Sequence, residues 1–465
     1  MIKKLLTLFF ITVSTIASSQ YAHQNIDLMS NFNDSNVVPE PVYGIRYQSC
    51  WGWVDPTNGR EYGIIGSTSG TYIIEVTDPY NLVVRDYVPG RNQGRIWHEY
   101  KTYQNYLYIV SDGGGNSLQI ADLSYLPDSV HVIYDSTAIF DSGHTLYVDG
   151  DKLYVARVSI PNTYSSSMNV YSLANGPVPV LLRQLDQDYP AINHVHDMYV
   201  TNDTVYASCE YQGLYVFRYD ELNNRFIQLG SLTTYPDQGY NHSSFLDETH
   251  TTLYMCDEVP DAMAIKVLDV SDLNNIIVVD TFSSDPGNTP HNPYVLGTEL
   301  FMANYQDGVQ AFDISNPHTP VKNGFFDTHP QNPAGTYPYP PYAGCWAVYT
   351  DLPSGHLLAS DMQLGLFVLD ISQVMNTSSI PFAETRMTLF PNPAHSYFDI
   401  NFPENPKQSY TIYVYDSSGK KIRQDVAADS SEKFRMNTSE LANGVYTVVT
   451  ISNLTTQVLP LIVAH

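Results

Sequence analysis

Five histidines recur along the chain at spacings close to fifty residues. They are His98, His144, His196, His242 and His291. Imidazole nitrogens bind zinc and other transition metals, and a neutral imidazole beside a carboxylate can transfer protons near neutral pH. The regular spacing indicates that one structural unit repeats and brings these side chains to the same place. The histidines are therefore candidates for a metal site or for acid–base chemistry.

A second set of polar residues follows the histidines, at the ends of strands predicted further along each unit. Its members are Asp112, Arg157, Glu210, Asp257, Glu258, Asn304 and Asp361. Carboxylates that converge with imidazoles can hold a divalent metal ion. We select His242, Asp257 and Glu258 as the candidate metal site and leave the identity of the ion open. A repeat also propagates any residue that suits its fold, so the histidines would equally serve as structural hydrogen-bonding groups.

The segments that lead into the histidine positions are rich in tyrosine. The candidates are Tyr235, Tyr240, Tyr337, Tyr339 and Tyr342. Aromatic rings of this kind stack on sugar rings or grip a peptide, and they also suit solvent-facing turns. Together with the histidines and the polar residues, these tyrosines make up the predicted ligand-binding rim.

The elements that position these residues form a repeat that occurs seven times. We place the unit openings at Trp51, His98, His144, His196, His242, His291 and Trp346. Each unit contains about four short strands, a pattern typical of a seven-bladed β-propeller, whereas an open β-solenoid would usually have shorter repeats. In a propeller blade the innermost strand starts on the face where the second strand ends. The histidines and the polar residues should therefore share one rim of the central channel.

Closure of the ring can also be predicted. The seventh unit lacks a fourth strand, and residues 25–32 resemble such a strand without having a unit of their own. We expect this N-terminal strand to complete blade seven. Cys50 and Cys345 occupy the same position in units one and seven, which become neighbours when the ring closes, and neighbouring blades approach closely there. This arrangement permits a disulfide between them in an exported protein.

Export is indicated by the N-terminus and agrees with the charge. Residues 1–19 have the charged start, the short apolar stretch and the small residues of a secretory signal peptide. No later segment has 18 uninterrupted apolar residues, so we expect no transmembrane segment in the mature chain. The net charge of −26 argues against nucleic acid and anionic membrane as partners, because both require a basic surface.

The chain divides into a propeller over residues 20–378, a linker over 379–386 and a small β-sandwich over 387–465. The last part contains Phe390-Pro-Asn-Pro393, Tyr415-Asp-Ser-Ser-Gly-Lys420 and Leu441-Ala-Asn-Gly-Val-Tyr446. In this order these motifs resemble the C-terminal sorting domain of the Bacteroidota type IX secretion system. The resemblance implies that this machinery is a partner and carries the protein across the outer membrane. Release or surface attachment would follow.

The propeller resembles the LVIVD-repeat, choice-of-anchor B family over about residues 24–375. The matching motifs include Trp51-Gly-Trp53, His196-Asp197, Asp257-Glu258, Pro290-His-Asn292 and Gly344-Cys-Trp346. The resemblance implies a propeller joined to a surface anchor and brings no activity with it. We therefore favour an exported or cell-surface binding module for an extracellular glycan or peptide over an enzyme. The alternative is a metal-assisted extracellular hydrolase or lyase that uses the histidine and carboxylate rim.

Overall fold

The computed structural model describes residues 21–465 except 113–117, 160–164, 285–288, 331–341, 378–387, 402–409, 417–419, 428–432 and 452–455. The expected signal peptide, the whole expected linker, Tyr337 and Tyr339 lie outside the described residues. The chain forms two compact units, Met1–Ser378 and Ser379–His465. Among the described residues, no helix has the length and apolar character needed to cross a membrane.

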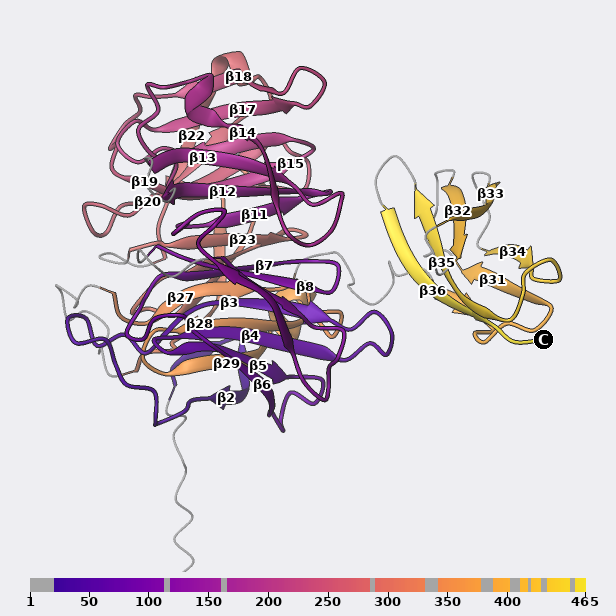
Figure 1. Cartoon of the computed structure of the whole chain (residues 1–465). Coiled ribbons are helices and arrows are strands. Elements are labelled where there is room, and N and C mark those ends of the chain that lie inside the picture. The colour runs from indigo at the N-terminus through magenta and orange to yellow at the C-terminus, as the bar shows by residue number, and fades with distance from the viewer. Residues whose placement is uncertain are drawn as a thin grey trace, which may run out of the picture. The chain divides into compact units, whose positions relative to one another are not determined.

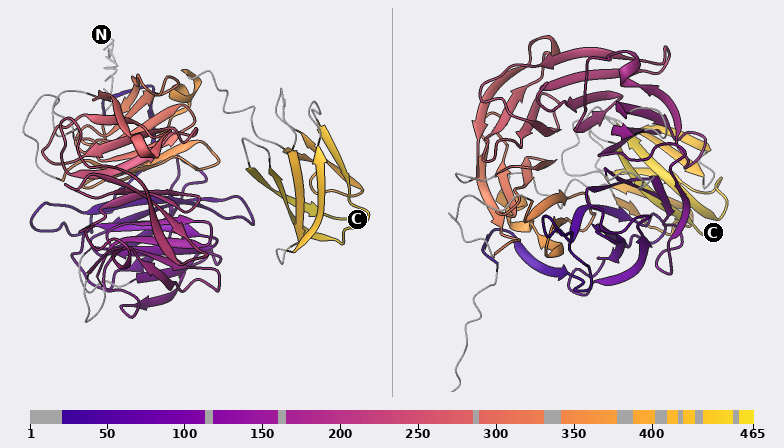
Figure 2. Two further views of the ribbon diagram at one scale, coloured as in Figure 1. Left: turned by 90° about the horizontal axis from the view of Figure 1, so that it is seen from above. Right: turned by 60° about the vertical axis from the view of Figure 1, so that its left-hand side comes forward.

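The first unit consists of seven antiparallel sheets that follow one another around a central axis (Figures 1 and 2). Within each sheet, strands that are consecutive in sequence are neighbours, so each sheet is one propeller blade. The seven-bladed β-propeller predicted from the repeat is confirmed.

The strands of blades one to four run outward from the axis in chain order. Blade one contains β3 (Tyr47–Val54), β4 (Glu61–Ser67), β5 (Gly70–Glu75) and β6 (Val83–Pro89), and blade two contains β7 (His98–Tyr103), β8 (Tyr106–Ser111), β9 (Leu118–Asp122) and β10 (His131–Ser136). Blade three contains β11 (Leu146–Asp149), β12 (Lys152–Ser159), β13 (Ser165–Ser172) and β14 (Val180–Gln184), and blade four contains β15 (Asp197–Thr201), β16 (Thr204–Ser208), β17 (Leu214–Asp220) and β18 (Arg225–Leu232).

Blades five to seven follow the same pattern, with additions from the N-terminus. Blade five contains β19 (Asn241–Leu246), β20 (Thr252–Asp257), β21 (Ile265–Asp269) and β22 (Ile277–Phe282). Blade six contains β23 (Asn292–Leu296), β24 (Glu299–Ala303), β25 (Val309–Asp313), β26 (Val321–Phe326) and β1 (His23–Gln24). Blade seven contains β27 (Cys345–Tyr349), β28 (His356–Asp361), β29 (Gly365–Asp370) and β2 (Asp27–Phe32). The short helix α1 (Ser372–Thr377) follows blade seven.

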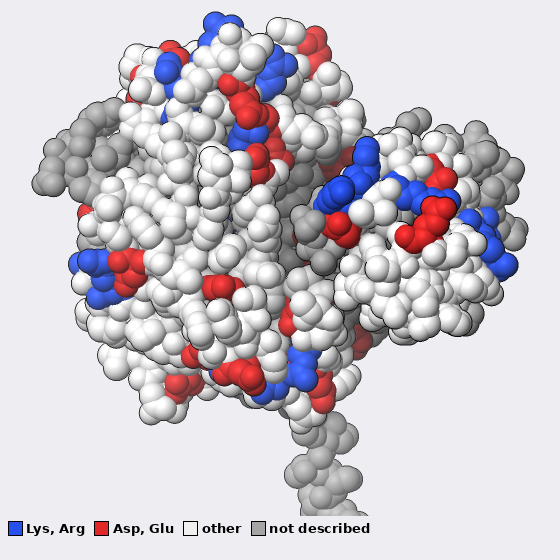
Figure 3. Space-filling view, turned by 45° about the vertical axis from the view of Figure 1, so that its right-hand side comes forward, with Lys and Arg blue, Asp and Glu red and all other residues white. Residues whose placement is uncertain are grey.

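The middle strands of each blade are buried on both faces because a neighbouring blade covers each face. Strand β8 is buried over almost its whole length, whereas the outer strand β10 is largely exposed. Between blades two and three, Tyr108 and Ile120 pack in one cluster with Leu153 and Val155. Continuous apolar runs therefore mark the inner strands, as expected for strands covered on both sides. On the face shown in Figure 3, most residues are uncharged and the charged ones stand in small groups.

The N-terminal segment closes the ring as predicted. Strand β2 pairs antiparallel with β29, with Phe32 opposite Leu366. The preceding strand β1 pairs with β26, so the segment also extends blade six. The ring of Tyr21 packs on both Phe326 and Phe367, with centroid distances of 5.5 and 5.4 Å. One segment therefore fastens blades six and seven together.

Blade one has a different register from the one predicted, because Gln48 and not Trp51 occupies its histidine position. The side chain of Gln48 contacts the imidazole of His98 in the next blade. Trp51 lies three residues further along β3, where its ring contacts Tyr349 at a centroid distance of 4.6 Å. Trp51 thus corresponds to Tyr147 and Tyr199, which lie three residues after their histidines.

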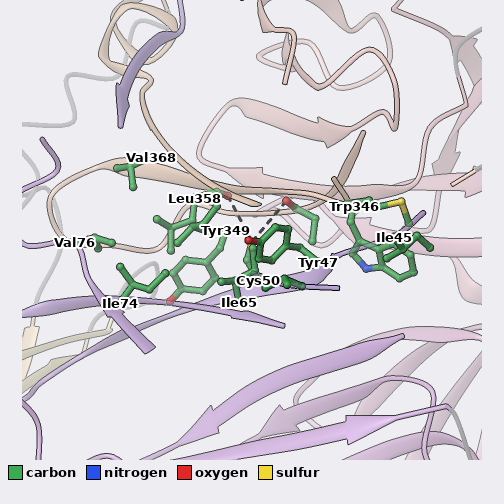
Figure 4. Packing of buried hydrophobic residues seen from close by; sticks show 14 of the residues in the cluster. Ile45, Tyr47, Cys50, Ile65, Ile74, Val76, Trp346, Tyr349, Leu358 and Val368 are labelled. Carbon is green, nitrogen blue, oxygen red and sulfur yellow. Dashed lines mark hydrogen bonds between the residues drawn. The ribbon is translucent and has the colours of Figure 1, made fainter. Parts of the chain in front are cut away.

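Cys50 and Cys345 are free thiols and not a disulfide, and the register shows that they are not equivalent positions, although both Sγ atoms lie near the carbonyl oxygen of Ala347. Cys345 precedes Trp346 directly, so its counterpart in blade one is Tyr47, three residues and about 10 Å of strand before Cys50. Cys50 lies in an apolar cluster with Tyr47 and Tyr349, and its Sγ is 3.6 Å from the carbonyl oxygen of Ala347 (Figure 4). Cys345 belongs to a different cluster. Cys209 and Cys256 are also buried free thiols.

The second unit is a small β-sandwich. One sheet has the order β30 (Thr388–Phe390), β31 (Tyr397–Asn401), β34 (Lys433–Asn437), and the other the order β33 (Lys421–Ala427), β32 (Tyr410–Asp416), β35 (Gly444–Ile451), β36 (Thr456–Val463). Phe398 and Met436 from the first sheet share a core with Ile412 and Val448 from the second. This architecture agrees with the all-β expectation for the C-terminal part.

Candidate functional site

Four of the five recurrent histidines form an arc around the propeller axis. The imidazole centroids of His144, His196, His242 and His291 follow one another at 4.2 Å. The indole of Trp346 continues the arc at 4.8 Å from His291. Each of these residues stands at or just before the start of an innermost strand, and all these strands begin at one rim. The predicted convergence of these four histidines is present.

Backbone carbonyl groups fix the tautomers of two of these imidazoles. Nδ1 of His196 lies 3.2 Å from the carbonyl oxygen of His242, and Nδ1 of His291 lies 2.7 Å from that of Trp346. A carbonyl oxygen only accepts, so each Nδ1 donates its proton and each Nε2 keeps a lone pair. Burial lowers the pKa of His291 to about 3 and the pKa values of His196 and His242 well below the usual value. These imidazoles are neutral at neutral pH.

His98 does not join the arc. Its ring contacts the side chain of Gln48, and burial lowers its pKa to about 4. The preceding residue, Trp97, takes its place: its indole stacks on Trp346 with a centroid distance of 4.9 Å. Trp97 has a positive φ of 67°, a conformation that non-glycine residues rarely adopt and that is concentrated at functional sites. His98 is therefore a structural link between blades one and two.

Further along the innermost strands lies a second ring, to which every blade contributes one side chain. Its members are Trp51, Lys101, Tyr147, Tyr199, Phe245, Tyr294 and Tyr349. The ammonium group of Lys101 lies 4.0 Å from the ring centroid of Trp51 and 5.8 Å from that of Tyr147, which closes the circle. The arc and, apart from Tyr349, the members of this second ring line a cavity of about 110 Å³.

Two carboxylates and one ammonium group line the same cavity. Glu99 accepts a hydrogen bond from Nε1 of Trp346 at 3.1 Å. Burial raises the pKa values of Glu99 and Asp197 and lowers that of Lys101, while the charges of Glu99 and Asp197 act in the opposite direction on the lysine. Sequence reasoning missed these three residues. Two of them could have been found, since Glu99 and Asp197 each directly follow a recurrent histidine.

The predicted polar residues of the rim fall into two groups, and the first group faces the channel mouth. Asp112 lies 3.2 Å from Nδ1 of His144 and 3.7 Å from Arg157. Glu210 accepts a hydrogen bond from the hydroxyl of Tyr240 at 2.9 Å.

Glu258 completes this first group. Its carboxylate, like that of Glu210, accepts a hydrogen bond from a tyrosine hydroxyl. It accepts a hydrogen bond from the hydroxyl of Tyr305 at 2.5 Å, and its Oε2 lies 3.9 Å from Nε2 of His242. Tyr305 is fixed in turn by two backbone hydrogen bonds with Cys345 in blade seven. The carboxylates of Asp112, Glu210 and Glu258 thus follow the line of the histidine arc.

The second group is fully buried and engaged within the blades. Asp361 accepts a hydrogen bond from the hydroxyl of Thr328 at 2.9 Å, and Nδ2 of Asn304 donates to Ser284 at 2.8 Å. Asp257 forms a 2.8 Å ion pair with the buried Lys266.

Asp257 is therefore not brought to His242, although the sequence analysis grouped it with that histidine and with Glu258. Its carboxylate also accepts hydrogen bonds from the hydroxyl of Tyr235 at 2.9 Å and from the backbone of Gly239 at 3.0 Å. Successive side chains on a strand point in opposite directions, so only one of Asp257 and Glu258 can reach the channel. Tyr235 is likewise a buried partner of Asp257 and not a rim residue.

An aromatic surface extends from the arc on the side of blades one, two and seven. We call it the aromatic platform and define it as Tyr43, Trp97, Tyr342 and Trp346. Tyr342 contacts Tyr43 at a centroid distance of 5.1 Å and Trp97 at 5.0 Å. Tyr43 is 41% exposed, so a ligand can reach it. Of the predicted tyrosines, Tyr342 and Tyr240 therefore lie at the mouth.

Comparisons with known proteins identify the tail. Residues 388–464 match the family model for a secretion system C-terminal sorting domain. No match was found among curated protein sequences.

Solved structures resemble the chain at low identity. The extracellular domain of a one component system from B. thetaiotaomicron is 11% identical, with a TM-score of 0.45, 94% of this chain and 60% of that chain covered. The periplasmic gluconolactonase of Pseudomonas aeruginosa is 13% identical, with a TM-score of 0.47 and coverages of 80% and 96%. The Cps50 (Swd1) β-propeller domain of Myceliophteria thermophila is 11% identical, with a TM-score of 0.45 and coverages of 66% and 93%.

The fold and the sorting domain together give the protein its class and location. A sorting domain of this family directs its carrier to the type IX secretion machinery in Bacteroidota. The chain is a β-propeller protein that is secreted or displayed on the outer-membrane surface, with a C-terminal sorting domain over residues 388–464.

Proposed function

We propose that the propeller is an extracellular binding module for neutral glycans and that the mouth of its channel is the binding site. The observation that carries this proposal is the aromatic platform directly beside the carboxylates and imidazoles of the rim. Aromatic faces pack against the C–H faces of sugar rings, and carboxylates and imidazoles exchange hydrogen bonds with sugar hydroxyls. The secretion signal places such a module where polysaccharides are found.

The charges of the rim favour a neutral glycan over an acidic one. Asp112, Glu210 and Glu258 are carboxylates, and Arg157, the cation found among them, is paired with Asp112 at 3.7 Å. An anionic sugar bound beside these three residues would meet their negative potential. The cavity of about 110 Å³ is too small for an oligosaccharide, so most of a longer glycan would lie on the platform.

We also propose that the propeller is a member of the LVIVD-repeat, choice-of-anchor B family. This assignment rests on the motifs over residues 24–375, and the combination of a propeller with a separate sorting domain supports it. Residues 20–378 would be the binding module and residues 387–465 the export signal, joined by the linker 379–386. A metal-assisted hydrolase or lyase remains the competing function and would require a metal ion at the rim.

A glycan array with the full-length protein tests the proposal. Tyr43→Ala and Tyr342→Ala should each weaken binding to the best neutral glycan about tenfold in calorimetry. Tyr80→Ala is the matched control, because Tyr80 is 66% exposed in the turn between the third and fourth strands of blade one, on the opposite rim. Binding to peptides alone, or glycan binding that neither platform variant weakens, would reject the proposal. Release of reducing sugar from a bound glycan would indicate an enzyme.

A further inference from the structure

We propose that His242, Glu258 and His291 form a binding site for a zinc-class transition metal ion at the channel mouth. One ligand atom from each residue lies within 4.8 Å of the other two, and Nε2 of His242 is 3.9 Å from Oε2 of Glu258. Ligands of a tetrahedral zinc ion stand about 3.4 Å apart, so small side-chain rotations would complete the geometry. This inference rests on the geometry of these three residues and does not require the proposed glycan binding.

The three ligands stand in or next to paired strands of blades five and six. His242 lies in β19, Glu258 directly follows β20 in the same blade, and His291 directly precedes β23 in the next blade. The backbone of Asn241 and of Glu210 exchange hydrogen bonds at 3.1 and 3.2 Å, which ties blade five to blade four beside the site. All three ligand side chains are largely buried, so they would lose little conformational freedom when a metal ion binds.

Two of the ligands are already oriented by a second group. Nδ1 of His291 donates to the carbonyl oxygen of Trp346 at 2.7 Å, which leaves the lone pair of Nε2 for a metal ion. The hydroxyl of Tyr305 donates to Oε1 of Glu258 at 2.5 Å and leaves Oε2 on the side of His242. Carbonyl and hydroxyl groups of this kind hold the ligands of known metal sites and tune their affinity.

The charge of Glu258 is also uncompensated. Its carboxylate contacts His242 and Tyr305, and over the described ranges no lysine or arginine forms an ion pair with it. A buried carboxylate without a cation is unfavourable, and a bound cation removes this cost. By contrast, Asp257 is neutralised by Lys266 and Asp112 by Arg157.

The donor set selects the class of ion. Two imidazole nitrogens and one carboxylate oxygen suit zinc and its neighbours, whereas calcium and magnesium require mostly oxygen ligands. Three protein ligands leave at least one coordination position of a tetrahedral ion open. His242 and His291 both line the cavity, so this position is available to water or to an oxygen atom of a ligand.

Calorimetry with zinc chloride alone tests the site on the full-length protein, purified without a histidine tag and stripped with a chelator. We expect one equivalent of zinc to bind. Glu258→Gln should weaken binding at least tenfold, since the amide keeps the size of the side chain and its bond to Tyr305 but loses the charge. His291→Ala should abolish binding.

His194→Ala is the matched control, because His194 lies on the same rim, 3.4 Å from Glu210, and outside the cluster. Its zinc affinity should equal that of the unmodified protein. Absence of zinc binding, or equal loss in the control and in Glu258→Gln, would overturn the proposal. Circular dichroism confirms that each variant is folded, and glycan binding measured in chelator separates a failure of this site from a failure of the glycan proposal.

Discussion

Trp97 of blade two stacks on Trp346 of blade seven, although blade one lies between these two blades in the ring. The two indoles are nearly parallel, with an interplanar angle of 29°. The loop before β7 therefore crosses the rim of blade one and joins its neighbours. Because Trp346 also contacts His291, this stack connects the aromatic platform with the histidine arc.

Replacing Trp97 should separate glycan binding from zinc binding. Trp97→Asn keeps a residue that tolerates the positive φ of 67° but removes the indole from the platform. We expect glycan affinity to fall at least tenfold and zinc affinity to stay within twofold, since Trp97 contacts none of the three proposed ligands. Calorimetry with each ligand measures both effects. Parallel loss of zinc and glycan binding would mean that the platform and the arc act as one site.

The buried ion pair between Asp257 and Lys266 should govern stability and not binding. Asp257→Asn leaves the ammonium group of Lys266 buried without its carboxylate, and breaking one partner of such a pair costs about 3–5 kcal/mol. The double variant with Lys266→Met should recover most of this loss. All four tryptophans lie in the propeller, so their fluorescence during guanidinium unfolding reports on this unit.

The same variant also checks the assignment of the metal ligands. Asp257→Asn should bind zinc as the unmodified protein does, provided that it is folded at the temperature of the measurement. If it instead lost zinc binding without losing stability, Asp257 and not His291 would be the third ligand.

The repeat made the propeller and its closure predictable, because apolar runs at a period near fifty residues leave few alternatives. Register was harder to predict. In β3 the pairing with β4 shifts between Tyr47 and Cys50, and such a bulge adds residues that a count of spacings cannot reveal. The pairing of β19 with β20 shifts in a similar way between Asn241 and Ser243, opposite the end of β20. This shift contributes to the orientation of Glu258 toward the channel.

Two of the four residues of the aromatic platform, Tyr43 and Trp97, could not be predicted from the repeat. Tyr43 comes from the segment before blade one, and Trp97 reaches the platform only through its unusual backbone conformation. These two features depend on contacts between distant segments and not on local periodicity. The histidine arc, in contrast, follows directly from the position of each histidine at the start of an innermost strand.

Buried histidines should make the propeller unstable in acid, and His98 provides a test outside the metal cluster. Its pKa is about 4 in the folded protein, against about 6.5 when unfolded. Above pH 6.5 both states are neutral and the pH has no effect through this group. Below pH 6.5 only the unfolded state gains the proton, so the unfolding free energy falls by up to about 1.4 kcal/mol per pH unit.

His98→Gln removes this contribution and leaves the other titrating groups in place. Between pH 6 and 4.5 its unfolding free energy should therefore fall less steeply than that of the unmodified protein, by up to about 1.4 kcal/mol per pH unit. Guanidinium titrations at several pH values measure both slopes. Identical slopes would show that His98 becomes protonated in the folded protein.

The N-terminal segment should stabilise the ring mainly through one buried side chain. Ile26, between β1 and β2, is fully buried in a cluster with Phe326, Phe367 and Leu369 from blades six and seven. Truncating a buried isoleucine to alanine costs about 2–5 kcal/mol, so Ile26→Ala should lower the unfolding free energy by that amount. Leu28→Ala, on the adjacent strand and 39% exposed, should cost well under half as much. If both variants lost equally little, the backbone pairing of β2 with β29 and not the apolar contact would hold the ring closed.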